Sequence, residues 1–215
     1  MIHTLDDAIV FLKRFHRHRL EDPSWNTELL DGDLPPGLCQ VYRNLGGFLE
    51  LDEEAGSNPL GAQNVLAHPS DLLRVDGMVE FAFENQGNWS CRCALGEEDP
   101  AVYSDATEYW SHPRPGFNLV SQSLNRFLIT FCLTEAIFSC EELIVVQDLA
   151  AVESLCLKAL WLDAPYVFEE PFPGFYTSED ETVLMADFGA DIRIGRRRYS
   201  VNSSRSRILQ TTPSA

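Results

Sequence analysis

The chain has 215 residues, of which 45% are hydrophobic and 11% aromatic. A chain of this length buries roughly 70% of the surface that it exposes when unfolded, so its fold needs no disulfide. It carries 33 acidic and 16 basic residues and a net charge of −17. Residues 20–188 hold 30 acids and 6 bases, whereas residues 189–215 hold one acid and 6 arginines. A body this acidic repels nucleic acid and attracts a basic protein partner, although acidity also serves solubility alone.

The N-terminal residues do not resemble a secretory signal, because acids precede the first apolar stretch and bases follow it. No segment approaches the ~18 consecutive apolar residues of a membrane span. We therefore expect a soluble, cytoplasmic protein. The six cysteines include no CxxC pair with partnering histidines, so we expect reduced, mostly buried thiols.

Two helices are predicted in the first fifty residues. Thr4 is a suitable N-cap for the first, at about residues 6–18, which has acids in its first turn and bases in its last. The second begins at Pro35, and its apolar residues recur at helical spacing. Gly46 and Gly47 are expected to end it, because glycine takes the left-handed conformation common at helix C-termini.

A β-hairpin is predicted next. Residues 77–84 alternate between apolar and polar side chains, residues 85–88 supply a turn, and residues 89–93 alternate again. The residues expected on the buried faces are Val79, Phe81, Phe83, Trp89, Cys91 and Cys93. Another turn, at residues 97–100, leads to a short strand at 101–103.

Asn118 is expected to cap a long apolar helix that covers the sheet. The elements predicted beyond it are a strand at 143–146, a helix at 149–160, and a ribbon of strands at 182–188 and 192–201 that turns near Gly189. Strands flanked by helices, without repeated βαβ units, predict an α+β protein with a mostly antiparallel sheet packed against helices in a single domain.

Three segments, in this order and spacing, resemble the SUKH superfamily: LPPGLCQVYRNLGG at 34–47, FAFENQGNWSC at 81–91 and EEDPAVY at 97–103. They match a proline-led helix ending in two glycines, a strand with a Glu-Asn-Gln-Gly turn before a tryptophan strand, and an acidic Asp-Pro turn. The residues that carry the resemblance are Pro35, Tyr42, Gly46, Gly47, Glu84, Asn85, Gln86, Gly87, Trp89 and Pro100. We expect them to have structural roles, Asn85 and Gln86 by bonding the backbone at the hairpin end.

The resemblance implies an α+β fold with one antiparallel sheet backed by helices. We expect a SUKH-like domain at residues 1–140, a C-terminal elaboration at 141–201 packed on the same domain, and a disordered tail at 202–215. Many bacterial members are immunity proteins that neutralise a polymorphic toxin, often a nuclease, by direct binding. Other members are regulatory scaffolds, so a regulatory protein that binds a housekeeping partner is the alternative.

The sequence contains no motif for nucleophilic, metal-dependent or phosphate-binding catalysis, and its five histidines are scattered. Carboxylates in an exposed polar turn have no evident reason for a shifted pKa. We therefore expect no enzymatic activity, cofactor or metal, and an enzyme with an unrecognised site is a minor alternative.

Acidic residues in the turns, with nearby aromatic residues as anchors, are the candidates for contact with a basic toxin. These candidates are Asp52, Glu53, Glu54, Glu97, Glu98, Asp99, Tyr103, Asp105, Glu108, Tyr109 and Trp110. On a toxin that is a nuclease, such carboxylates would shield the basic surface that binds the phosphates of its substrate. A solvated acidic face is the alternative for each of them.

Arginines gather near the C-terminus, at Arg193, Arg196, Arg197, Arg198, Arg205 and Arg207. Three interpretations are open: pairing with the acidic body, contact with a partner, or nucleic-acid binding. The last is the least favoured, because only Tyr199 interleaves them and a strongly acidic body adjoins them.

Overall fold

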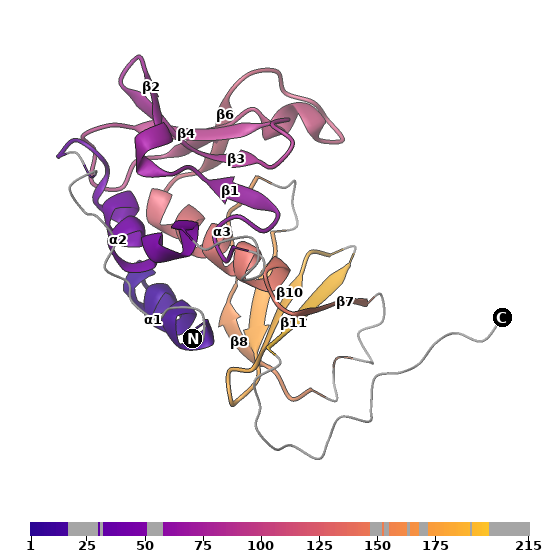
Figure 1. Ribbon diagram of the computed structural model, residues 1–215. Coiled ribbons are helices and arrows are strands. Elements are labelled where there is room, and N and C mark those ends of the chain that lie inside the picture. Colours follow the sequence, from indigo (N-terminus) through magenta and orange to yellow (C-terminus); the bar gives the residue numbers. More distant parts are fainter. Residues whose placement is uncertain are drawn as a thin grey trace.

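The computed structural model describes residues 1–16, 30, 32–50, 58–146, 152, 155–162, 164–167, 172–189 and 191–197. These residues form three α-helices and two antiparallel sheets, so the α+β prediction is confirmed (Figure 1). The predicted acidic cluster at residues 52–54 and the predicted tail at 202–215 lie outside the described residues. No described helix is long and apolar enough to cross a membrane.

Helix α1, Leu5–Phe15, begins as predicted. The Thr4 side chain accepts a hydrogen bond from the Asp7 N–H, and the Asp7 carboxylate accepts one from the Thr4 N–H, which forms a capping box. The helix ends earlier than predicted because the His16 backbone leaves helical geometry, with φ −105° and ψ 17°. The buried His16 ring then packs edge-on against Phe15.

Helix α2, Pro36–Leu45, carries a proline at its first position, where the missing N–H is not needed. The helix ends at Leu45 with Gly46 as its C-cap, as predicted, but the left-handed conformation expected there is wrong. Gly46 stays right-handed, with φ −58°, and the chain continues as a 3-10 helix over Gly46–Glu50. This extension carries Phe48 into the core, where its side chain is 1% exposed.

Helix α3, Leu124–Phe138, lies between the two sheets and is buried on almost all sides (Figure 1). The prediction that Asn118 caps it is wrong, because Asn118 begins a strand and Ser123 is the N-cap. Asp99 holds this end of the helix: its carboxylate accepts hydrogen bonds from the Ser123 hydroxyl at 2.7 Å and the Asn125 N–H at 2.9 Å. The start of α3 is therefore fixed by a residue far away in sequence.

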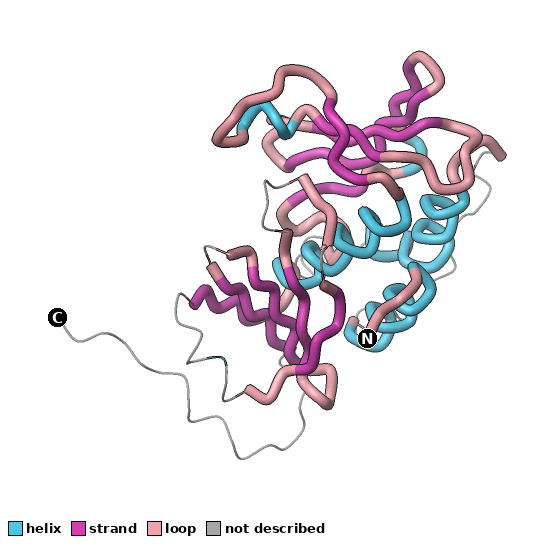
Figure 2. Tube along the Cα trace, turned by 180° about the vertical axis from the view of Figure 1, so that it is seen from behind, coloured by secondary structure: helices cyan, strands magenta, loops and turns pink. Residues whose placement is uncertain are grey.

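The first sheet has the strand order β1-β3-β4-β5-β6, with β2 also paired to β3. Its strands are β1 (Asn64–Leu66), β2 (Leu73–Val75), β3 (Met78–Glu84), β4 (Ser90–Ala94), β5 (Val102–Ser104) and β6 (Asn118–Ser121). The α-helices lie on one side of this sheet, as both views show (Figures 1 and 2). We call the opposite side the outer face.

The hairpin of β3 and β4 is confirmed. Gly87 allows the turn with φ 74°, a left-handed conformation that side chains disfavour. The Glu84 carboxylate accepts hydrogen bonds from the backbone N–H groups of Gln86 and Asn88. Glu84 therefore holds the turn, rather than the side chains of Asn85 and Gln86 as predicted.

Phe83 does not face the core, contrary to prediction. A β-bulge between Glu80 and Ala82 inserts one extra residue opposite β4. The extra residue reverses the alternation of inward and outward side chains along β3. Phe81 and Ala82 are therefore both buried, and Phe83 is turned to the outer face. The predicted burial is confirmed for Val79, Phe81, Cys91 and Cys93, and Trp89 is partly buried against the same core.

The second sheet has the order β7-β11-β10-β9-β8, where the resemblance had implied a single sheet. Its strands are β7 (Glu142–Val146), β8 (Lys158–Trp161), β9 (Gly174–Thr177), β10 (Val183–Asp187) and β11 (Ile192–Arg196). The strand predicted at 143–146 and the ribbon turning at Gly189 are confirmed. The helix predicted at 149–160 is wrong at its described end, because Cys156 has φ 49° and β8 follows it.

One hydrophobic core joins the helices to both sheets. The second sheet and its flank contribute Leu160, Trp161, Tyr166, Phe175 and Leu184 to the cluster that contains α3. The Trp161 indole N–H also donates a hydrogen bond to the Thr130 hydroxyl of α3 at 3.1 Å. One face of the first sheet therefore packs against this core, and the outer face does not.

Candidate functional site

The outer face of the first sheet carries one row of side chains that crosses five strands. Strand pairing places the following residues in direct register: Leu73 of β2, Glu80 of β3, Arg92 of β4, Tyr103 of β5 and Leu119 of β6. Adjacent strands lie about 4.8 Å apart, so the row spans about 19 Å. We call these five residues the central row.

Large apolar side chains are exposed on the outer face: Leu73 (54%), Val75 (46%), Phe83 (39%) and Leu119 (41%). Two of them are turned outward by β-bulges, Phe83 by the bulge in β3 and Leu119 by a second one where β5 pairs with β6. Bulges often re-aim side chains beside functional sites. Glu80, Arg92 and Tyr103 lie between Leu73 and Leu119 in the central row, so the face combines exposed apolar side chains with polar ones, as protein-binding surfaces do.

Arg92 lies at the centre of the central row. Its guanidinium carbon is 3.7 Å from the centroid of the Phe117 ring, a close cation–π contact. Glu80 stands directly across from it on β3, yet no ion pair joins the two. The Arg92 Nε atom is buried and has no hydrogen-bond acceptor among the described residues.

Acidic residues lie at both ends of the strands that form the outer face. At one end the β2–β3 and β4–β5 turns meet, because the Leu95 N–H donates to the Gly77 carbonyl at 2.9 Å. At the other end lie the β3–β4 turn and the 3-10 helix Ala106–Tyr109. The first end carries Asp76, Glu97, Glu98 and Asp99, and the second carries Glu84, Asp105 and Glu108. The predicted contact residues thus form two groups rather than one cluster.

Three of the predicted carboxylates bond within the molecule. Asp99 caps α3, Asp105 accepts a hydrogen bond from the first N–H of β4 at 2.8 Å, and Glu108 accepts one from the loop before β6 at 2.7 Å. Glu97 and Glu98 are exposed in the β4–β5 turn. Among the predicted acids that the structure describes, Glu97 and Glu98 therefore have most freedom to meet a partner.

The predicted aromatic anchors differ in their accessibility. Tyr109 is 65% exposed, and its hydroxyl donates a hydrogen bond to the Asn88 carbonyl at 2.9 Å. Trp110 is partly buried against the core and donates its indole N–H to the Val167 carbonyl at 2.9 Å. Tyr103 is partly buried in the central row. Tyr109 is the anchor that the fold exposes best.

The residues that carry the family resemblance lie in structural positions. The buried Tyr42 hydroxyl donates to the Ala67 carbonyl at 2.8 Å, which ties α2 to the loop after β1. The Pro100 carbonyl accepts the first N–H of α3 at 2.8 Å. Pro35 is buried as the residue that precedes α2. Each of these contacts positions a helix against the first sheet.

Two of the three described C-terminal arginines, Arg193 and Arg197, form hydrogen bonds within the molecule, whereas the buried Nε of Arg196 has no acceptor among the described residues. Arg197 donates hydrogen bonds to the carbonyls of Arg14 and Phe15 at the end of α1, where a cation complements the helix dipole. Arg193 forms an ion pair with Asp191 at 2.9 Å. Arg197 also donates a hydrogen bond to the Glu181 carbonyl of the second sheet's β9–β10 turn. Residues 198, 205 and 207 lie outside the described residues.

Sequence reasoning missed Glu135, a carboxylate of α3 that is 0% exposed. It accepts hydrogen bonds from the N–H groups of Gln63 and Asn64 at 2.7 and 3.0 Å, and from the Asn64 side-chain amide at 3.0 Å. The same amide also donates to the Tyr166 hydroxyl. Burial raises the pKa of Glu135 to about 7, and the hydrogen bonds oppose that rise. A glutamate within an apolar helical stripe was the one available signal.

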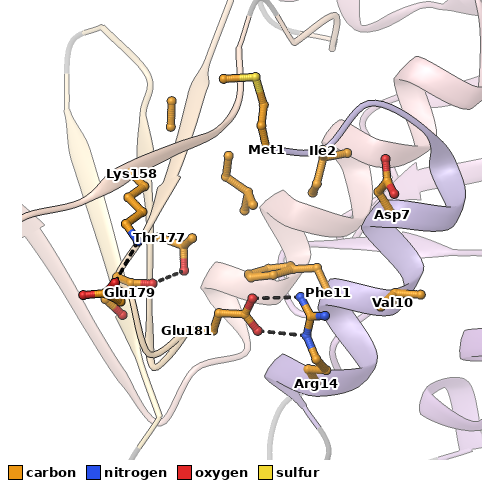
Figure 3. A pocket seen from close by; sticks show the side chains of 13 residues that line it. Met1, Ile2, Asp7, Val10, Phe11, Arg14, Lys158, Thr177, Glu179 and Glu181 are labelled. Carbon is orange, nitrogen blue, oxygen red and sulfur yellow. Dashed lines mark hydrogen bonds and ion pairs between the residues drawn. The ribbon is translucent and has the colours of Figure 1, made fainter.

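A cleft of about 330 Å³ lies between α1 and the second sheet (Figure 3). Arg14 of α1 forms a two-bond ion pair with Glu181, and Lys158 of β8 pairs with Glu179 at 3.1 Å. The floor includes the buried side chain of Phe11. Both basic side chains of the cleft are already paired to glutamates, so its charges favour no particular ligand.

The six cysteines are free thiols, as expected. Burial raises the pKa of Cys91 and Cys132 and raises that of Cys93 to about 12, which makes these thiols poor nucleophiles. Among the described residues, no group of three or more histidine, cysteine or acidic side chains is arranged to hold a metal ion.

Comparison with known proteins finds no matching protein family, no matching curated protein and no matching solved structure.

Proposed function

We propose that the chain is an immunity protein of the SUKH type, which neutralises a cognate toxin by binding it through the outer face of the first sheet. One observation carries the proposal: no α-helix of the described residues lies over this face, which exposes four large apolar side chains between two acidic ends. The three segments that resemble the SUKH superfamily build the same sheet and its supporting helix.

Exposed apolar side chains and acidic turns thus share one face, and protein–protein interfaces likewise combine apolar contacts with a charged rim. Residues 64–121, which contain the sheet, hold nine acids and three arginines. Such a surface speeds association with a basic partner and loses this advantage as salt rises. A nuclease fits this chemistry, because its substrate-binding surface must be basic, and carboxylates at the two ends would shield that surface.

The test is co-expression of the chain with each basic protein encoded beside its gene, scored by growth of the host. The variant Phe83→Ser with Leu119→Ser removes half of the exposed apolar side chains of the outer face. The matched control, Leu143→Ser with Val145→Ser, removes similarly exposed side chains, 41% and 56%, from β7 of the second sheet.

Wild type and control should protect the host, and the outer-face variant should not. At about 1 kcal/mol for each half-exposed side chain, the variant should weaken toxin binding roughly 30-fold. Failure of the wild type to protect against any neighbouring gene product would reject the immunity function. Equal protection by the outer-face variant would instead reject this surface.

A further inference from the structure

Arg92 is at odds with a surface that binds only basic groups. It lies at the centre of the outer face, between Glu80 and Tyr103 in the central row, while the acidic residues occupy the two ends. A uniformly basic partner would bring positive charge against this guanidinium, and like charges in an interface weaken binding. The centre of the face therefore favours an acidic group of the partner, and the two ends favour basic groups.

The guanidinium of Arg92 is held in place before any partner binds. Its stack on Phe117, at 3.7 Å, fixes the plane in which its N–H donors lie. Its Nε is buried and has no acceptor among the described residues, so a partner would meet the terminal nitrogens of the guanidinium. Glu80 does not pair with Arg92 although strand register places the two side by side. An arginine arranged in this way is suited to a carboxylate, which matches its planar fork of donors.

We infer that Arg92 binds a carboxylate of the partner, so that the segment that docks on the outer face carries an aspartate or glutamate between apolar side chains and basic residues farther out. This inference rests on the proposed function, because it names the partner of the same surface. Leu73 and Leu119 at the ends of the central row meet the apolar side chains, and Glu97 and Glu98 meet basic residues.

Arg92 then acts as a specificity residue. When a partner without the carboxylate covers the face, the guanidinium loses its water and gains no acceptor, a penalty that disfavours the wrong partner. The expected discrimination between an acidic and an isosteric amide side chain at this position is about tenfold or more.

The experiment selects binders from a displayed library of random twelve-residue peptides with two forms of the full chain as bait, wild type and Arg92→Gln. The control bait is Arg43→Gln, which removes an exposed arginine of α2 on the helical side of the sheet. Wild type and control should enrich peptides with a central aspartate or glutamate flanked by apolar and then basic residues. The Arg92→Gln bait should lose the preference for the central acid.

The strongest peptide is then synthesised with its central acid and with the matching amide, and both affinities are measured. A tenfold preference for the acid with wild type, absent with Arg92→Gln, supports the inference. Equal affinity of both peptides for wild type would overturn it and leave the outer face as a binding surface. No enrichment of any peptide by wild type, or no loss of binding with Phe83→Ser and Leu119→Ser, would contradict the docking surface itself.

Discussion

Glu135 makes the stability of this protein depend on pH in a direction opposite to that of most paired carboxylates. Its folded pKa, about 7, lies above the ordinary value of 4.5 because burial disfavours the charge. The folded state therefore binds the proton more tightly than the unfolded state between these two values. The contribution of Glu135 is complete below about pH 4.5 and is lost as pH rises through 7. A difference of 2.5 in pKa corresponds to about 3 kcal/mol.

The substitution Glu135→Gln isolates this effect. The glutamine carbonyl can accept both backbone N–H groups, and its amide can donate to Asn64 once that side chain turns over and accepts from Tyr166. Urea unfolding from pH 4.5 to 8 should give a free-energy difference, wild type minus variant, that falls by about 3 kcal/mol as pH rises. Comparison with the variant cancels the other titrating groups.

A difference that stays flat over this range would show that the three hydrogen bonds balance the effect of burial on the pKa, and one that rises with pH would show that they outweigh it; either result would contradict the raised pKa. Glu135→Leu provides the contrast. It removes the acceptor of three hydrogen bonds and leaves the backbone N–H groups of Gln63 and Asn64 without a partner, so it should lower the free energy of unfolding by several kcal/mol at every pH.

Two further predictions concern the C-terminal part of the chain. Arg197→Ala removes the hydrogen bonds to the end of α1 and should lower the free energy of unfolding by about 2 kcal/mol. The control Arg43→Ala, at an exposed arginine, should change it by less than about 0.5 kcal/mol. Equal effects of the two variants in chemical denaturation would contradict the capping role of Arg197. Truncation after Arg197 retains β11 and should preserve both the circular dichroism spectrum and toxin binding, whereas truncation after Phe188 removes the strand between β7 and β10 and should unfold the second sheet. Loss of binding on truncation after Arg197 would favour the regulatory alternative, in which the C-terminal extension is the specialised element.

The elements that sequence predicted well are those fixed by local pattern. The β3–β4 hairpin has an alternating strand, turn residues and a second alternating strand in one short stretch, and the ribbon of β10 and β11 likewise turns at Gly189. The strands β1, β2, β8 and β9 have three or four residues each. Such lengths are too short for a period to be seen, so these strands exist through their pairing partners.

The errors have long-range causes. Asn118 is a good helix cap by composition, but Asp99 and Ser123 hold the start of α3, and Asp99 comes from the β4–β5 turn. Phe48 draws the chain past Gly46 into a further helical turn. In both cases a tertiary contact overrides a local preference.

The sequence predicted the acidic turns of the candidate site but not the side chains that lie between them. The acidic turns follow from composition and turn chemistry, and the structure places them at the two ends of the outer face. The exposure of Phe83 and Leu119 depends on two β-bulges, which follow from strand register and leave no mark in an alternating sequence. The row from Leu73 through Arg92 to Leu119 appears only when five strands are aligned.

The central claim is that the outer face of the first sheet binds the toxin, and hydrogen–deuterium exchange on the chain with and without its toxin tests it most directly. Toxin bound to this face should slow exchange in β2, in β3 after its bulge and in the β4–β5 turn, and should leave β7 of the second sheet unchanged. Protection confined to the second sheet, with β2 and β3 exchanging as in the free protein, would contradict it.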